Sequence, residues 1–113
     1  MKEMKDFVKF EPDFPNSEYL KGEELIGKTL EIKAVVLKKG ETSEYFVILA
    51  NVDGKEISFS NGGAVIVDKL KLACKEFKMP CLINERVTFP EEIRAKLVYK
   101  MSPTSKRMYY TFE

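Results

Sequence analysis

At 113 residues, the chain is long enough for one domain with a single modest core. Its composition, 44% hydrophobic and 33% charged, is that of a globular protein and excludes a disordered one, and no apolar run approaches the roughly 20 residues that span a bilayer. The formal net charge of +1 is far from the strongly basic balance of a dedicated nucleic-acid binder.

The absence of histidine restricts the chemistry that the chain can perform. Neither a Ser-His-Asp nor a Cys-His arrangement can be assembled, nitrogen-ligated zinc is excluded, and two cysteines alone make a poor metal site. No glycine-rich phosphate-binding motif occurs, and the 18 Asp and Glu residues are spread through segments that we interpret as surface. A carboxylate-only hydrolase or a divalent-metal site stays open as an alternative, but we expect a protein that is not an enzyme and that has no cofactor and no metal.

The cysteines and the first residues indicate a compartment. Cys74 and Cys81 form no CxxC motif, so two reduced thiols are favoured over one disulfide. The start, MKEMKDFVKF, lacks the apolar stretch of a secretory signal, and we expect a cytoplasmic protein with no membrane segment. The abundance of Lys and Glu, together with the lack of Gln and His, indicates a thermophilic source.

Residues 1–27 differ from the rest of the chain. They contain two prolines, no sustained hydrophobic period, and four lysines against seven carboxylates, a net charge of −3. We interpret them as an extended N-terminal arm whose aromatic residues (Phe7, Phe10, Phe14 and Tyr19) dock on the domain rather than build a strand. The domain itself is predicted to span residues 28–113.

Residues 28–61 predict three strands. In KTLEIKAVVLKKG (28–40), Leu30, Ile32 and Ala34 alternate with polar residues until Val35–Leu37, where the break predicts a mid-strand bulge. In residues 43–61, two strand-like runs flank Asp53-Gly54, the favoured pair for a two-residue type I′ turn. That register places Phe46, Ile48, Ala50, Ile57 and Phe59 on the core face. It places Tyr45, Val47, Leu49, Ser58 and Ser60 on the opposite face, which is more apolar than a solvated surface needs.

Residues 60–80 predict one helix, capped by Ser60 or Asn61, ending at Met79-Pro80, with Cys74 in its buried stripe. A loop follows, with a short extended piece at residues 87–89. Residues 93–101 and 106–113 then predict a second hairpin around residues 102–105, with Tyr109 facing out and Tyr110 facing in.

This order of elements predicts the fold class. Five short antiparallel strands, with one helix between the third and the fourth, are the layout of a mainly β, OB-fold-like Greek-key barrel. Other five-stranded α+β arrangements fit the same order of elements.

Two stretches, EYLKGEELIGKTLEIKAV and GKEISFSNGGAVIVDKL, resemble the small OB-fold, single-stranded-DNA-binding-like proteins of phages, archaeal viruses and their hosts. In that family a Leu-Lys-Gly-x-x-Leu-x-Gly-Lys stretch leads into the first strand, and a strand ending in Asn turns into the helix. The matching positions are Leu20, Lys21, Gly22, Leu25, Gly27, Lys28, Phe59, Asn61 and Leu70. The resemblance implies the fold over residues 18–72 and no catalytic residue, and it makes single-strand binding an expectation by fold analogy.

An OB-fold binds oligonucleotides on the outer face of its second and third strands, framed by the loops between strands one and two and between strands four and five. Here those loops are KKGETS and KMSPTSKR, and residues 94–113 carry five cations and one carboxylate, a net charge of +4. Cations contact phosphates, and aromatic rings stack on bases. The candidate nucleic-acid-binding residues are Lys33, Lys38, Lys39, Tyr45, Val47, Ser58, Lys96, Lys100, Lys106, Arg107 and Tyr109.

These residues predict sequence-tolerant, non-catalytic binding of single-stranded nucleic acid, with ssDNA as the first expectation. The alternative is an OB-fold subunit for protein–protein interaction or assembly, as a homodimer or with another partner, because the face with Val47 and Leu49 is apolar enough for such a contact. The acidic arm also has two interpretations: it competes with nucleic acid for the groove, or it covers apolar surface.

Overall fold

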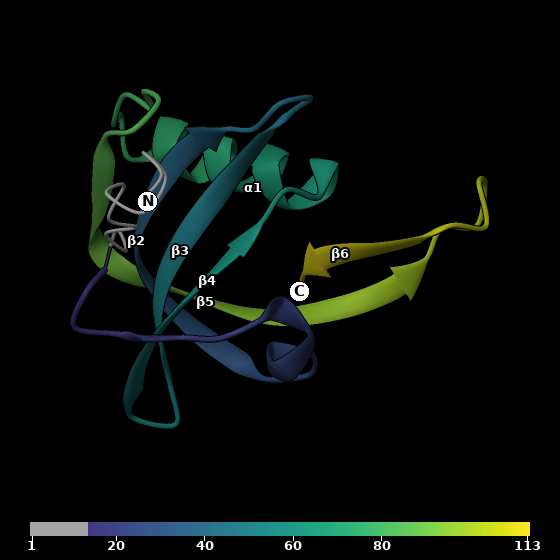
Figure 1. Ribbon diagram of the computed structural model, residues 1–113, viewed down its shortest axis with the longest axis horizontal. Helices are drawn as coiled ribbons and strands as arrows, with labels where there is room; N and C mark the ends of the chain where they lie inside the picture. Colours follow the sequence, from purple (N-terminus) through teal and green to yellow (C-terminus); the bar gives the residue numbers. More distant parts are fainter. Residues whose placement is uncertain (1–13) are drawn as a thin grey trace, which may run out of the picture.

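The computed structural model describes residues 14–113, so the predicted docking of Phe7 and Phe10 lies outside the described residues. This part of the chain is mainly β, with one α-helix and one short 3₁₀ helix (Figure 1). In chain order the elements are β1 (Glu18–Tyr19), η2 (Gly22–Leu25), β2 (Thr29–Lys39), β3 (Glu44–Val52), β4 (Lys55–Asn61), α1 (Ala64–Glu76), β5 (Arg86–Met101) and β6 (Met108–Phe112).

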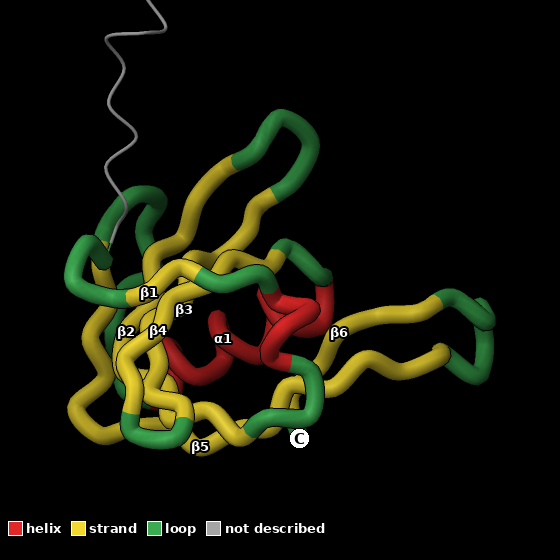
Figure 2. Tube along the Cα trace, turned by 60° about the horizontal axis from the view of Figure 1, so that its bottom comes forward, coloured by secondary structure: helices red, strands yellow, loops and turns green. Residues whose placement is uncertain are grey.

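The strands form one curled sheet, a half-barrel, in the order β1-β4-β3-β2-β5-β6. The helix α1 follows β4 in the chain and packs inside the curl, in contact with β3 and β6 (Figure 1, Figure 2). The predicted mainly β fold with one helix is confirmed. The sheet has six strands, however, where the sequence predicts five.

The extra strand belongs to the segment that the sequence predicts as an arm. Glu18 and Tyr19 pair in parallel with Ile57 and Ser58 of β4. The expectation that residues 1–27 build no strand is therefore wrong. The strand β1 forms because the outer edge of β4 carries backbone groups that need hydrogen-bond partners, and the flanking chain supplies them.

The β3–β4 hairpin confirms the predicted register. Ala50 pairs with Ile57, and both turn residues, Asp53 and Gly54, have positive φ angles of 51° and 80°, as a type I′ turn requires. The residues predicted for the inner face are at most 2% exposed and lie in the main core: Phe46, Ile48, Ala50, Ile57 and Phe59.

The central strand β2 changes the face of its side chains at Lys33. Its pairing with both β3 and β5 shifts between Ile32 and Ala34. Ile32 and Val35 consequently both point into the main core, while Ala34 points to the opposite face. The mid-strand irregularity that the sequence predicts is thus present, but it lies at Lys33 and not at Val35–Leu37, where the strand alternates regularly and is apolar on both faces. The placement of Ala34 beside Ile32 is wrong, because the shift turns Ala34 to the opposite face.

The helix α1 is shorter than predicted because β4 continues to Asn61. The N-cap is Gly63, with no side-chain cap bond, so the predicted cap at Ser60 or Asn61 is wrong; Asn61 Oδ1 instead accepts a hydrogen bond from Gly63 N at 2.8 Å. The predicted burial of Cys74 is confirmed at 1% exposure, and this burial raises the pKa of its thiol to about 12.

The strand β5 runs from Arg86 to Met101 without interruption, where the sequence predicts a short piece at residues 87–89 and a separate strand from residue 93. Pro90 lies between the two blocks of pairing with β2, which end at Thr88 and resume at Ile93. The missing N–H of this proline therefore costs no hydrogen bond of the β2–β5 ladder.

Among residues 14–113, no helix combines the length and the apolar character that crossing a bilayer requires.

The segment between β1 and β2 is part of the barrel. Leu25 of η2 is 1% exposed and packs in the main core, and Gly27 N donates to Leu97 O at 2.7 Å. Residues 20–27 are therefore fixed to the domain, although the predicted boundary at residue 27 places them in the arm.

Leu25→Ala should lower the free energy of unfolding by about 2–5 kcal/mol, because it leaves a cavity where the N-terminal segment joins the core. Ile26→Ala, at a neighbouring side chain that is 41% exposed, should cost much less, about 1 kcal/mol or below. Urea denaturation measures both values. Small and equal losses would show that residues 20–27 are not part of the folded domain.

Candidate nucleic-acid interface

The outer face of β2, β3 and β4, on the side away from the main core, carries a second apolar cluster. We call it the outer-face cluster: Phe14, Ala34, Val36, Val47 and Leu49, with Tyr45 packed at its margin. Val47 and Leu49 are only 9% and 8% exposed. The face predicted to bind nucleic acid is therefore covered, which explains why it is more apolar than a solvated surface needs.

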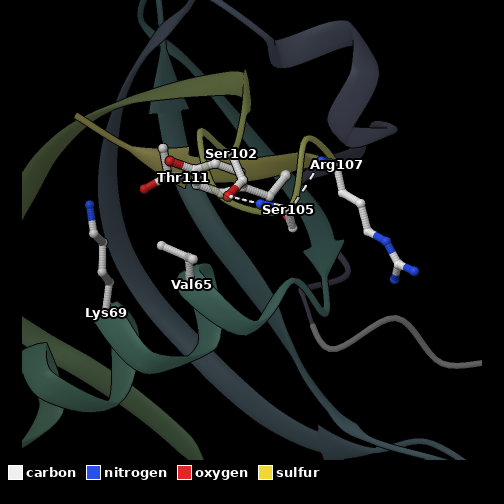
Figure 3. A pocket seen from close by; sticks show the side chains of 7 residues that line it. Val65, Lys69, Ser102, Ser105, Arg107 and Thr111 are labelled. Carbon is white, nitrogen blue, oxygen red and sulfur yellow. Dashed lines mark hydrogen bonds between the residues drawn. The ribbon is translucent and has the colours of Figure 1, made fainter.

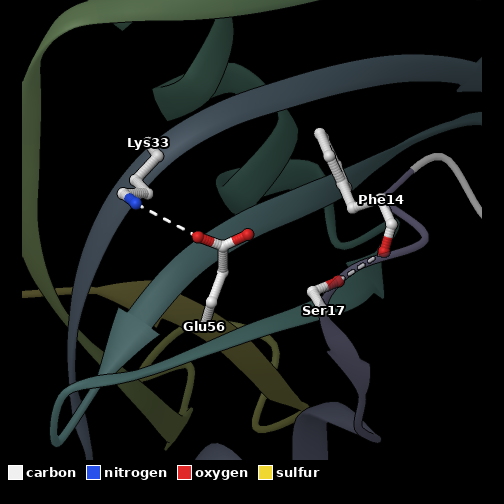
Figure 4. Close-up of polar contacts among 4 residues, drawn as sticks. All are labelled: Phe14, Ser17, Lys33 and Glu56. Carbon is white, nitrogen blue, oxygen red and sulfur yellow. Dashed lines mark hydrogen bonds and ion pairs between the residues drawn. The ribbon is translucent and has the colours of Figure 1, made fainter.

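The cover consists of residues 14–19, which we call the strap. Ser17 Oγ lies 2.6 Å from Phe14 O and 2.8 Å from Ser58 Oγ, within hydrogen-bond distance of both (Figure 4 shows the first contact). Tyr19 OH lies 2.7 Å from Ser60 Oγ. The strap thus covers apolar surface, which is one of the two interpretations of the acidic arm. The surface that it covers is the outer face of β3 and β4, where the sequence predicts nucleic-acid binding.

Cross-strand neighbours line up under the strap in one row. Arg86 lies opposite Val36, Val36 opposite Val47, and Val47 opposite Ser60. Directly opposed residues of antiparallel strands project to the same face, so this row has an apolar middle with a cation at one end and a hydroxyl at the other. The guanidinium carbon of Arg86 lies over the Phe14 ring, 4.6 Å from its centroid.

The β5–β6 hairpin forms a second candidate surface, because it projects from the barrel (Figure 1, Figure 2). Tyr99 and Tyr110 are cross-strand partners whose rings stack, with centroids 4.7 Å apart and planes 18° from parallel. Further out on the same face lie Met101 and Met108, which are 60% and 46% exposed. Burial, the Glu23 carboxylate and the neighbouring Tyr99 raise the pKa of Tyr110 above its ordinary value.

The other face of the hairpin forms an open groove of about 430 Å³ against α1. Its lining combines apolar surface with hydroxyl and cationic groups, from Val65, Lys69, Ser102, Ser105, Arg107, Tyr109 and Thr111. Figure 3 shows Lys69 at one end of the groove and Arg107 at the other, with the Arg107 side chain directed outward. Lys69 Nζ donates to Phe112 O at 2.7 Å, so this lysine also holds α1 against β6.

The predicted site residues thus divide between covered and exposed positions. Val47 and Ser58 lie buried under the strap, and Tyr45 is half-buried beside it. Lys39, Lys96, Lys106, Arg107 and Tyr109 lie outside it, all exposed except the half-buried Tyr109. The structure therefore does not bring the eleven residues together into one open surface.

Three of the predicted cations have partners or neighbours within the described chain. Lys33 Nζ lies 3.1 Å from Glu56 Oε2 (Figure 4), and Lys100 forms an ion pair with Glu113. Lys38 is half-buried and lies opposite Tyr45 across the β2–β3 ladder. Of the remaining exposed cations (Lys39, Lys96, Lys106 and Arg107), Lys106 and Arg107 are adjacent and lie at the hairpin tip between β5 and β6, so they are the strongest candidates for phosphate contacts.

Sequence reasoning missed Phe14, Ser17 and Arg86 as parts of the predicted binding face. Phe14 was expected to dock, but nothing in the sequence indicates where. Arg86 lies within the stretch predicted as a loop, directly before its short extended piece, so its position opposite Val36 follows only from the long β5.

Within residues 14–113, no three His, Cys, Asp or Glu side chains lie close enough together to hold a metal ion.

Comparison with protein-family models, with curated proteins and with solved structures found no match to this chain.

The raised pKa of Tyr110 gives a test of the hairpin geometry. In an alkaline titration followed by tyrosinate absorbance, one tyrosine should ionise above the ordinary value of 10.0, and Tyr110→Phe should remove that phase. The pKa of Tyr110 is higher in the folded state than in the unfolded state. The contribution of protonated Tyr110 to the free energy of unfolding is therefore present below pH 10 and is lost as pH rises through the folded-state pKa. Tyr109→Phe is the control and should keep the late phase. Loss of the late phase in Tyr109→Phe would contradict this geometry, because it would mean that Tyr109, and not Tyr110, points toward the core.

Proposed function

We propose that this chain is an OB-fold-like protein that binds single-stranded nucleic acid, in the first place ssDNA, without catalysis and with little sequence preference. Five strands, β2 to β6, with α1 between β4 and β5, support the OB-fold part of the proposal. The absence of a disulfide between Cys74 and Cys81 fits the cytoplasmic location that the proposal includes.

The observation that carries this proposal is the composition of the projecting β5–β6 hairpin. It combines a stacked pair of tyrosine rings, one of them 44% exposed, with exposed cations at its tip. Proteins that bind single strands without sequence preference use these two kinds of group together, because every base has a stacking face and every nucleotide has a phosphate. The groove between this hairpin and α1 adds several hydroxyl groups of the hairpin and Lys69 of α1.

Paired Lys106→Glu and Arg107→Glu changes should abolish most of the binding of a labelled oligothymidylate in fluorescence anisotropy, because they replace two phosphate contacts by repulsion. A salt series should also lose slope, by about 0.7 in log affinity per log salt for each phosphate contact removed. The control is Lys75→Glu with Lys78→Glu, which changes the charge equally at the far end of α1, away from the hairpin (Figure 1). Equal losses in both pairs, or no binding at low salt by the unchanged protein, would contradict the proposal.

A second candidate function, a protein–protein contact, is favoured by one observation. Tyr99, Met101 and Met108 form an exposed apolar strip on one face of the hairpin, and they are 44%, 60% and 46% exposed. A homodimer or an assembly subunit would use such a strip.

If the strip is a self-association surface, the protein should sediment as a dimer, and Met101→Ser with Met108→Ser should convert it to a monomer. Analytical ultracentrifugation without nucleic acid measures this. A monomer at every concentration argues against a homodimer and leaves the rings of the strip for stacking with bases.

A further inference from the structure

The strap places an aromatic ring and a cation together on the outer-face cluster. Phe14 is 2% exposed and packs on Val36, Val47 and their neighbours in the cluster. The Arg86 guanidinium lies over the ring, 4.6 Å from its centroid, and Arg86 stands opposite Val36 in the same cross-strand row. A planar ring that rests on an apolar floor under a guanidinium has the environment that single-strand binders give to a base.

The other contacts of the strap also have the chemistry of a bound nucleotide strand. The hydroxyl groups of Ser17 and Tyr19 lie 2.8 Å and 2.7 Å from the hydroxyl groups of Ser58 and Ser60 on β4. Such hydroxyls donate to and accept from base edges and sugars equally well. The Glu18 carboxylate forms an ion pair with Lys55, the first residue of β4, as a phosphate would. An aromatic ring, two hydroxyl groups and a carboxylate thus lie within the six residues of the strap (14–19).

The strap is attached less firmly than the sheet beneath it. Its strand β1 has two residues in parallel pairing at a sheet edge, whereas β3 and β4 share an antiparallel ladder of seven pairs. The chain is anchored again at Leu20, whose N–H donates to Ser58 O at 2.8 Å and whose side chain packs against the main core, and then at the buried Leu25. Elements with few backbone partners at an edge open at lower free energy than the whole fold, so the strap can leave while the barrel stays folded.

We propose that the strap is an intramolecular mimic of single-stranded nucleic acid, in which Phe14 takes the place of a stacked base and competes with the ligand for the outer-face cluster. This inference rests on the proposed function, because it takes nucleic acid as the ligand. The hairpin stays accessible when the strap is docked, so it supplies a first contact. The outer face supplies a second contact after release of the strap, and the docked fraction lowers the apparent affinity.

Removal of the ring tests the competition directly. Phe14→Ala should bind an oligothymidylate of about 15 nucleotides more tightly than the unchanged protein, by about 5-fold or more, which is the lower end of what one stacked base contributes. Asn16→Ala, at an exposed strap residue, is the control and should leave the affinity unchanged. Fluorescence anisotropy on the full chain measures all three.

An engineered disulfide that holds the strap on the sheet, here called the lock, provides a second test if Phe14→Ala fails to fold. Ser17→Cys with Ser58→Cys places two thiols where the hydroxyl oxygens lie 2.8 Å apart, and Cys81→Ala removes the half-buried native thiol from the exchange. The oxidised form should bind the oligonucleotide more weakly than the reduced form of the same protein. Binding that persists in the oxidised form should still be lost with Lys106→Glu and Arg107→Glu.

The outcomes separate the two proposals. Hairpin-dependent binding that neither Phe14→Ala nor the lock alters would overturn the competition and leave the proposed function standing. Weaker binding by Phe14→Ala would also overturn it, because the ring would then support the site. No binding in any form would overturn both.

Discussion

The register shift at Lys33 of β2 is the constraint that decides which side chains lie on each face of the sheet. β2 is the only strand of the described sheet that pairs with both β3 and β5, and the shift occurs in both ladders at the same place. It lets Ile32 and Val35 point into the main core, while Ala34 and Val36 form the floor of the outer-face cluster. A slip of one residue here would exchange the two faces, so the shift fixes which side chains the strap covers.

A half-barrel that is apolar on both faces needs a cover on each. Inside the curl, α1 packs with its buried stripe, and outside, the strap supplies Phe14. The two covers differ in kind: the helix has 13 residues with a continuous buried face, whereas the strap has one buried ring and a two-residue strand. Of the two covers, the outer one is therefore the one that a ligand can displace at the lower cost.

Local patterns predicted those parts of the fold that local chemistry determines. Asp53-Gly54 determines the β3–β4 register, the helical period places Cys74 in the core, and strand alternation puts Tyr110 toward the core and Tyr109 on the groove side. The bulge was misplaced because Lys33 alternates with apolar neighbours in the sequence, so the pattern shows no break at the position of the shift. β5 was split because Pro90 with two glutamates is typical of a loop, although those residues fall between two blocks of ladder pairing.

The candidate site was predictable only in part, for a related reason. The cations of the hairpin tip follow from composition, since a turn rich in Ser and Pro between two strands is exposed wherever it lies. The cover over Val47 and Ser58 involves contacts between residues about forty positions apart, such as Ser17 with Ser58. A two-residue strand has no period to reveal it, so no local pattern shows that this face is occupied.

A backbone-amide NMR titration of the full chain with an oligothymidylate tests the account most directly, because it reports the hairpin and the strap in one experiment. The account predicts shifts at residues 99–110 at low ligand concentration, followed by changes at residues 14–19 and at β4 as the strap leaves the outer face. Shifts confined to other elements, or no shifts at low salt, would contradict it.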